Sequence, residues 1–283
     1  NLRRLDSIKN DDTRPSSFRI NYTVNLYDFR LIFFGGMDFS LTPLNHIEAF
    51  NLLTYKWEKI ETKGKSPEPR HSHNSFIVGH NLYILGGTSA KDIFSKHGCF
   101  DDFFMLNLNS LTWTPIKMYG TPPKNLTSNY SFQLSEKYII FLACEAEEEE
   151  DNMTQVYRFD STHFEWENIQ SMSSQPEFRF GAGSCLDDVN MVAYIFGGIY
   201  FSRIESQSLT NEMDRIKFCE SKEGFEKLEL LSSDKMPLDL SSKSKEEPKL
   251  EKETTPNAGK NVFLMYSQVK GIRNQKAFHL RNY

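Results

Sequence analysis

The densest charge in the sequence is a run in which six of the seven residues from 145 to 151 are acidic. Such a run could bind a basic partner, a polycationic tail or a divalent ion, or it could be a solvated loop. We take these members of the run as candidate partner contacts: Glu147, Glu148, Glu149, Glu150 and Asp151.

The motifs of the common enzyme classes are missing from the sequence. It contains no phosphate loop, no His-Glu-x-x-His pair and no evident Ser, His and Asp set. The cysteines Cys99, Cys144, Cys185 and Cys219 are 45, 41 and 34 residues apart, whereas zinc ligands come in closely spaced pairs. We therefore expect no catalysis, no cofactor and no metal site, and we interpret the cysteines as small buried residues.

Composition narrows the class of protein further. The 283 residues include 33 Lys and Arg against 38 Asp and Glu, a net charge of −5, and show no basic stripe for phosphate neutralisation. Apolar residues make up 39% of the chain, which is enough for a folded core. The longest apolar segments, 139–144 and 191–201, are far shorter than the roughly 20 residues of a membrane-spanning helix. We expect a soluble chain that binds neither nucleic acid nor membrane.

An apolar segment that ends in two glycines recurs along the chain. It occupies residues 31–36, 82–87 and 193–198, and 138–144 is a degenerate copy with Ala143 and Cys144 in the glycine positions. The last position of each copy is 51, 57 and 54 residues after the one before it. The glycines of this repeat are Gly35, Gly36, Gly86, Gly87, Gly197 and Gly198.

Tryptophan is a second marker with the same period. Trp57, Trp113 and Trp166 are 56 and 53 residues apart, and Phe225 follows 59 residues later. An Asn or Asp stands six residues before each tryptophan, where its side chain can hydrogen-bond a turn between two strands. Two markers with one period indicate a structural repeat.

Each repeat unit therefore contains four short antiparallel strands. The first follows an arginine, Arg70 or Arg179, that lies 13 residues after a tryptophan; the second ends at the glycines; the third ends at the Asx turn; and the fourth contains the tryptophan. This pattern resembles the kelch repeat, whose units are the blades of a β-propeller. The resemblance implies an all-β, kelch-type β-propeller with four recognisable four-stranded blades plus partial end strands.

The repeat markers divide the chain into segments. If Arg14 is the arginine of the first unit, residues 1–13 hold the outer strand of a preceding or ring-closing blade, and residues 14–228 hold the four blades. The expected blades are 14–61, 62–119, 120–172 and 173–228. Residues 229–260 have the composition of a charged, disordered linker, and 261–283 form a docking tail with a strand at 262–266 that pairs with a sheet edge.

The resemblance also indicates where partners would bind. The loops between the second and third strands of the units, 37–47, 88–102, 145–153 and 199–212, are long and lie on one face. Arg70, His71 and Arg179 begin inner strands at that face, so the resemblance allows them to contact a ligand. The alternative is that the arginines hydrogen-bond carbonyls of neighbouring blades. Iron-dependent kelch proteins carry a Glu-x3-Asp-x3-His run, and the nearest match here ends in Gln155 in place of His.

We expect a non-catalytic scaffold for protein-protein interaction, a subunit of a larger cytoplasmic assembly. Its expected partners are other proteins, with no small-molecule substrate. Few alanines and many Asn, Lys, Phe and Ile residues are typical of an AT-rich genome, and they suggest a cytoskeletal or ciliary location. Alternatives are a substrate-recognition subunit of a ubiquitin ligase and, less favoured, a metal-dependent propeller enzyme.

Overall fold

The computed structural model describes residues 18–90, 98–145, 153–169, 179–200, 208–221, 224–235 and 268–269. Its described secondary structure consists of strands. Several expectations fall outside these residues: the outer strand of residues 1–13, Arg14, the acidic residues 147–151, residues 236–260 of the expected linker, and the strand at 262–266. The first part of the expected linker, residues 229–235, belongs instead to a strand of the fourth blade that ends at Lys235. The described residues include no helix long and apolar enough to cross a membrane.

Sixteen of the strands form four antiparallel sheets of four, the blades of a β-propeller. The first blade consists of β1 (Thr23–Tyr27), β2 (Arg30–Phe34), β3 (Ile47–Asn51) and β4 (Lys56–Ile60). The second consists of β5 (Asn74–Val78), β6 (Asn81–Leu85), β7 (Phe103–Asn107) and β8 (Thr112–Pro115). The third consists of β10 (Tyr130–Gln133), β11 (Tyr138–Glu145), β12 (Met153–Asp160) and β13 (Glu165–Asn168). The fourth consists of β14 (Gly183–Asp187), β15 (Val192–Phe196), β18 (Glu212–Ser221) and β19 (Gly224–Lys235). The predicted all-β propeller with four four-stranded blades is confirmed.

Four short strands complete the description. They are β9 (Tyr119–Gly120), β16 (Ile199–Tyr200), β17 (Ser208–Leu209) and β20 (Gln268–Val269). The strand β9 pairs in parallel with the outer strand β13 of the third blade, and β16 pairs with β17 next to the fourth blade. From the C-terminal region, β20 pairs in parallel with β1.

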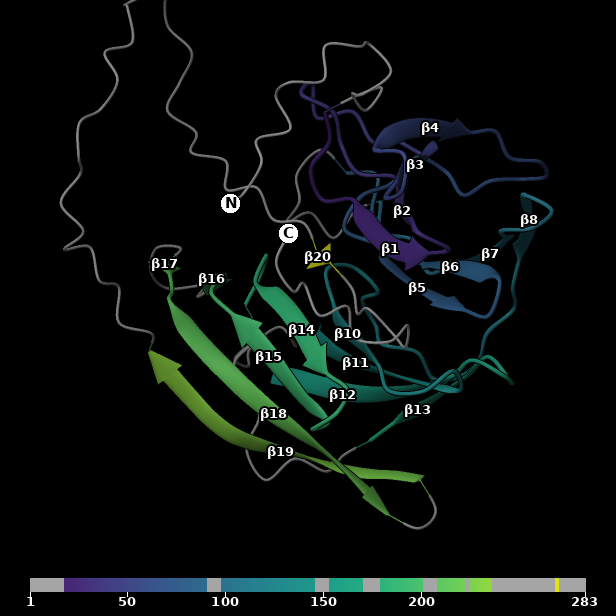
Figure 1. Cartoon of the computed structure of the whole chain (residues 1–283). Coiled ribbons are helices and arrows are strands. Elements are labelled where there is room, and N and C mark those ends of the chain that lie inside the picture. The colour runs from purple at the N-terminus through teal and green to yellow at the C-terminus, as the bar shows by residue number, and fades with distance from the viewer. Residues whose placement is uncertain are drawn as a thin grey trace, which may run out of the picture.

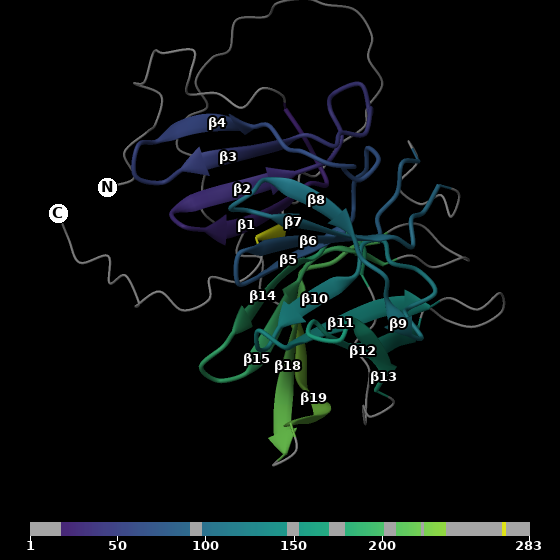
Figure 2. The ribbon, with the colours of Figure 1, turned by 90° about the vertical axis from the view of Figure 1, so that its right-hand side faces the viewer.

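The inner strands of the blades lie around a common axis. In chain order, β1 lies next to β5, β5 next to β10 and β10 next to β14, and β20 lies between β14 and β1. Figure 1 shows the blades following one another around this centre, and Figure 2 shows the first blade above the second, with the third and fourth blades below them. The second and third blades therefore each have one face turned to the blade before and one turned to the blade after, whereas the first and fourth blades each have one such neighbour in chain order.

Asx turns connect the third and fourth strands in three blades, as predicted. The side-chain oxygens of Asn51, Asn107 and Asp160 each accept hydrogen bonds from two backbone N–H groups two and three residues further on. In the fourth blade, the register places Lys217 in this position, and the strands continue to a hairpin beyond Ser221. A lysine cannot accept these hydrogen bonds, so this blade lacks the residue that ends the strand.

The longer hairpin corrects one sequence assignment. Trp57 pairs with Phe50, and in the fourth blade the residue equivalent to Phe50 is Ile216, which pairs with Leu230. Phe225, which the spacing had placed in the tryptophan position, pairs instead with Glu220 near the end of the hairpin. The spacing from Trp166 predicts the wrong residue here because β18 and β19 pair over a longer stretch than the third and fourth strands of the other blades.

The third blade shows what the paired glycines do. Gly86 and Gly87 have φ angles of +61° and +89°, a backbone conformation that interrupts the pairing of β6 with β7. Where Ala143 and Cys144 replace them, pairing continues through Cys144 opposite Thr154 to Glu145 opposite Met153. Loss of the glycines thus extends β11 and β12 to eight residues each.

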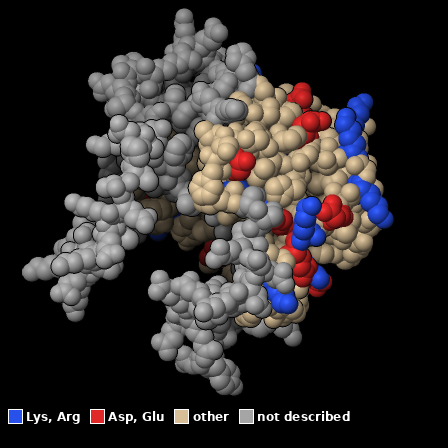
Figure 3. Space-filling model, turned by 90° about the horizontal axis from the view of Figure 1, so that it is seen from above, with Lys and Arg blue, Asp and Glu red and all other residues tan. Residues whose placement is uncertain are grey.

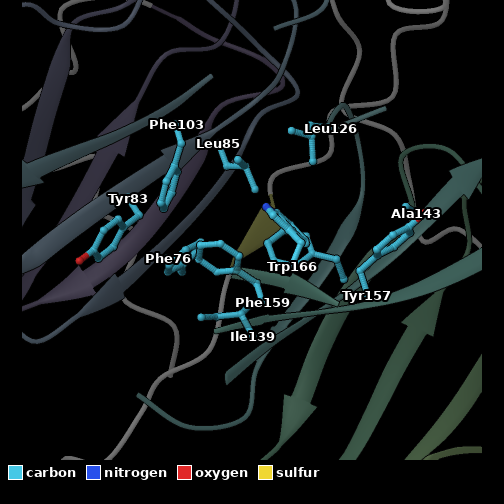
Figure 4. Close-up of a cluster of buried hydrophobic side chains, with 11 residues drawn as sticks. Phe76, Tyr83, Leu85, Phe103, Leu126, Ile139, Ala143, Tyr157, Phe159 and Trp166 are labelled. Carbon is cyan, nitrogen blue, oxygen red and sulfur yellow. The ribbon is translucent and has the colours of Figure 1, made fainter. Parts of the chain in front are cut away.

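The hydrophobic core is divided into three clusters, and each cluster fills the space between two consecutive blades. Figure 4 shows the cluster between the second and third blades, where Phe159 lies close to Trp166, with 4.8 Å between ring centroids, and Tyr83 lies next to Phe103. Phe103 and Phe159 are in edge-to-face contact, with 5.4 Å between ring centroids. Since alternate residues of a strand point to opposite faces, every blade contributes one set of residues to each neighbour.

Candidate functional site

The arginines that begin the inner strands lie inside the blades. Arg70 is 0% exposed and donates a hydrogen bond of 2.8 Å to the carbonyl of Gly86 in its own blade. Its guanidinium pairs with both carboxylate oxygens of Asp102 and lies 4.2 Å from the ring centroid of Phe100. A bidentate pair of this kind holds the start of the first strand against the start of the third.

Arg179 repeats this arrangement in the fourth blade. It is 1% exposed, donates to the carbonyl of Ile195 and forms an ion pair of 2.7 Å with Asp214. Glu212 lies 3.7 Å from the same guanidinium. Both arginines thus donate to a carbonyl of their own blade, whereas the alternative interpretation expected carbonyls of neighbouring blades.

Sequence reasoning missed the corresponding arginine of the first blade. Arg19, 17 residues before Gly36 as Arg70 is before Gly87, is buried, pairs with Glu48 and lies 3.4 Å from the carbonyl oxygen of Gly35. Burial lowers the pKa of Arg19, and the charge of Glu48 opposes that effect. The spacing to the second glycine was the signal that distinguishes Arg19 from Arg14.

His71 is also buried, with its Nε2 2.7 Å from the carbonyl oxygen of Ala90. Burial lowers the pKa of His71, and the hydrogen bond to Ala90 acts in the opposite direction. The three candidate contacts of the inner strands, Arg70, His71 and Arg179, therefore have almost no surface for a partner to contact. Their geometry supports a structural role.

The remaining candidate contacts, 147–151, lie outside the described residues, so their role stays a prediction. Among the residues that the structure does describe, no three His, Cys, Asp or Glu side chains come together in a way that could hold a metal ion. Cys99 and Cys185 are exposed, contrary to the expectation that the cysteines are buried. Surfaces that could receive a partner must therefore be sought elsewhere on the described blades.

The internal interfaces show what a covered blade face looks like. Leu82, Ile84, Leu106 and Trp113 form the face of the second blade turned to the first, and all are buried. In the third blade, the equivalent residues are Ile139, Phe141, Phe159 and Trp166, and they are buried too. The indole N–H of Trp113 also donates to Thr62 Oγ1, in the segment that follows the first blade.

The first blade carries the same set of residues on the face turned away from the second blade. We call Leu31, Phe33, Phe50 and Trp57 the first-blade face, since the strand registers match them to Leu82, Ile84, Leu106 and Trp113. Trp57 packs on Phe33 and Phe50, with 4.9 Å and 5.3 Å between ring centroids. All four side chains are partly exposed, and none belongs to a buried cluster.

The fourth blade has an uncovered face at the other end of the series. We call Tyr194, Phe196 and Met213 the fourth-blade face; they alternate along β15 and β18 with residues buried against the third blade. Phe196 is 47% exposed, whereas its equivalents Phe34 and Leu85 are 1% and 0% exposed. The fourth-blade face therefore has an aromatic side chain at a position that is buried in the first and second blades.

The space around the paired glycines also differs between the internal interfaces and the fourth-blade face. A Cβ atom on Gly35 would lie 2.6 Å from the carbonyl oxygen of Arg70 in the next blade, and one on Gly86 would lie 2.4 Å from Leu126. On Gly197, the nearest atom would be the carbonyl oxygen of Thr210, of the same blade, at 3.5 Å. Among the described residues, no following blade approaches Gly197 as the second and third blades approach Gly35 and Gly86.

Figure 3 views the molecule from the side of the first blade. Lys and Arg side chains lie mainly along the right-hand edge and in the lower part of the described surface, and Asp and Glu side chains are scattered among larger uncharged areas. Exposed apolar residues near the first-blade face include Leu53 and Tyr55, which are 67% and 53% exposed. Such surfaces are typical of protein-protein contacts.

The repeated four-stranded blades, paired glycines and buried tryptophans define a kelch-type β-propeller. A family model described as the KLHDC2/KLHL20/DRC7 kelch-repeats domain matches residues 5–209. The chain therefore belongs to the kelch-repeat family.

Parts of the chain are similar in sequence to parts of several longer proteins. Over 127 residues, the chain is 32% identical to "Rho GTPase-activating protein gacHH" of Dictyostelium discoideum, a match that covers 44% of this chain and 8% of that protein. It is 34% identical over 94 residues to "Dynein heavy chain-like protein 2" of Plasmodium falciparum (isolate 3D7), covering 32% and 2% of the two chains. It is 29% identical over 107 residues to human "Kelch domain-containing protein 3", covering 38% and 27%. Each match thus spans less than a third of the relative's length.

Proposed function

We propose that this chain is a non-catalytic scaffold for protein-protein interaction that works as a subunit of a larger assembly. Kelch propellers generally bind other proteins, and this family membership supports the general role. The single observation that carries the proposal is the exposure of Phe196 on the fourth-blade face, at a position that is buried in the preceding blades.

The physical reason lies in the cost of exposed apolar surface. Burial of an aromatic side chain at a protein interface removes a large apolar area from water and stabilises the complex. The first-blade and fourth-blade faces have the strand pattern of surfaces that, inside this chain, bind another sheet. They are therefore suited to bind a protein surface rather than a small molecule.

We place the assembly in the cytoplasm, with a cytoskeletal or ciliary structure as the favoured location. Support comes from the name of one relative, a dynein heavy chain-like protein, and from the composition of the sequence. Localisation of the tagged protein in its own cells tests this part; uniform staining away from microtubule structures would contradict it.

Affinity purification with matched variants tests the interaction itself. We expect the wild-type chain and Val189→Glu to retain the same proteins, because Val189 is 85% exposed on a turn of the fourth blade, away from its face. Phe196→Glu should lose those proteins, because a carboxylate on the fourth-blade face would have to be desolvated in the complex. Equal retention by Phe196→Glu and Val189→Glu would contradict the proposal.

A further inference from the structure

At the interface between the first and second blades, an equivalent of Phe196 of the fourth-blade face packs against an equivalent of Trp57 of the first-blade face. Phe34, the last residue of β2, packs against Trp113 of the second blade with 5.4 Å between ring centroids and an interplanar angle of 57°. Both side chains are nearly fully buried, at 1% and 4% exposure. This contact lies in the cluster that holds the first two blades together.

Both partners of that contact have an uncovered equivalent elsewhere in the chain. Phe196 ends β15 as Phe34 ends β2, and Phe196 pairs with Met213 of β18 as Phe34 pairs with Ile47 of β3. Trp57 pairs with Phe50 as Trp113 pairs with Leu106. One chain thus presents one face of each complementary kind, at opposite ends of its blade series.

The chain does not bring its own two faces together. The strand β20 lies between the inner strands β14 and β1, whereas Phe196 and Trp57 lie on the second strand of the fourth blade and the outer strand of the first. In this arrangement Phe196 remains 47% exposed and Trp57 partly exposed. None of the described residues of the chain buries these two side chains as their equivalents Phe34 and Trp113 are buried.

We propose that two copies of the chain bind head to tail, with Phe196 on the fourth-blade face of one copy packed against Trp57 on the first-blade face of the other. The contact repeats the internal packing of Phe34 on Trp113. It is heterologous, since different surfaces of the two copies meet, so one face of each kind remains for a further copy or for ring closure. This inference rests on the proposed function and names a second copy as the occupant of the interaction faces.

Sedimentation velocity of the full 283-residue chain over a range of concentrations tests the contact. We expect the wild type and the control Val189→Glu to associate reversibly. Phe196→Glu should weaken self-association at least about tenfold, because its charge stands where an aromatic ring must be buried. A wild-type chain that stays monomeric over the whole range, or a Phe196→Glu chain that associates normally, would overturn the proposal.

A mixing experiment tests the head-to-tail geometry. Trp57→Gln removes the indole ring without adding a charge, and this variant alone should also associate poorly. An equimolar mixture of Trp57→Gln and Phe196→Glu should form a 1:1 complex, because the mixture contains one intact Phe196 and one intact Trp57. A mixture that stays monomeric, although the wild type associates, would contradict the pairing of these two faces.

Fluorescence supplies a measurement that does not depend on the variants. Trp113 and Trp166 are already buried, so a shift of emission to shorter wavelength on association should come from Trp57. Association without that shift would overturn the contact. If the chain stays monomeric but still retains other proteins through Phe196, the head-to-tail contact fails while the proposed scaffold function stands; if it retains none, both fail.

Discussion

The internal interfaces and the two end faces are built from the same repeat, yet they differ in what surrounds them. Trp113 and Trp166 each lie between two blades and are 4% and 3% exposed, whereas Trp57 has the same register and remains partly exposed. Phe34 and Phe196 differ in the same way. Equivalent residues therefore contribute to stability where a neighbouring blade covers them, and to association where none of the described blades does.

We expect the largest change in stability when a tryptophan between two blades is replaced by alanine. Trp166→Ala should lower the free energy of unfolding by about 4 kcal/mol, because it leaves a cavity between the second and third blades. Trp57→Ala should lower it by only about 1 kcal/mol, since its ring is less completely buried. Urea unfolding at low protein concentration measures both. Equal losses would show that the first-blade face is as well packed as an internal interface.

The buried ion pairs come next in size. Asp214→Ala leaves the guanidinium of Arg179 buried without its nearest carboxylate, which should cost about 3 kcal/mol. The control is Asp234→Ala in the same blade, where the pair with Arg215 is exposed and its loss should cost less than about 1 kcal/mol. Thermal unfolding of the two variants gives the difference. A small effect of Asp214→Ala would mean that Glu212 replaces it as the partner of Arg179.

The glycines give a third, smaller contrast. Gly86→Ala should destabilise the protein by about 2 kcal/mol or more, because its Cβ would overlap Leu126 of the next blade at a positive φ. Gly197→Ala carries only the conformational penalty of its φ of +68°, about 1 kcal/mol. If Gly197→Ala also weakens self-association, a second copy approaches this glycine as the next blade approaches Gly86.

The smallest effect concerns the Asx turns and pH. Partial burial opposes ionisation of Asp160, but hydrogen bonds from the His163 side chain and two backbone N–H groups outweigh it and lower the pKa to about 2 from 3.8. Because the folded-state value is the lower one, the turn stabilises the fold fully above about pH 5 and loses this contribution as the pH falls towards 2.

We therefore expect Asp160→Asn to remove about 1 kcal/mol of the acid-induced loss of stability between pH 6 and pH 3. Asparagine already forms this turn at Asn51 and Asn107, so the variant should keep the hydrogen bonds of the turn. Unfolding curves at several pH values check the prediction. An unchanged pH dependence would show that Asp160 does not account for the acid sensitivity of the third blade.

Sequence reasoning was most accurate where a local residue forces a local conformation. The Asx turns at Asn51 and Asn107 were predicted from single side chains and their spacing, and the glycines that mark the repeat all have a positive φ. Sequence reasoning failed where a different residue at one position changed the pairing of residues elsewhere in the blade. Lys217 replaces the turn residue of the fourth blade, the hairpin lengthens, and Leu230 takes the position expected for Phe225. It also left out Arg19 and the carboxylates that pair with the buried arginines.

By itself, the sequence determined the repeat, the four strands of each unit and the class of fold, because period, glycines and turn residues act over a few residues. Only the tertiary structure decided which copies of a repeated face are covered. Burial depends on the neighbouring sheet, and neither Trp57 nor Phe196 differs locally from the residues that are buried at the internal interfaces. The candidate partner contacts Arg70, His71 and Arg179 became structural residues for the same reason: their surroundings, and not their residue types, place them inside the blades.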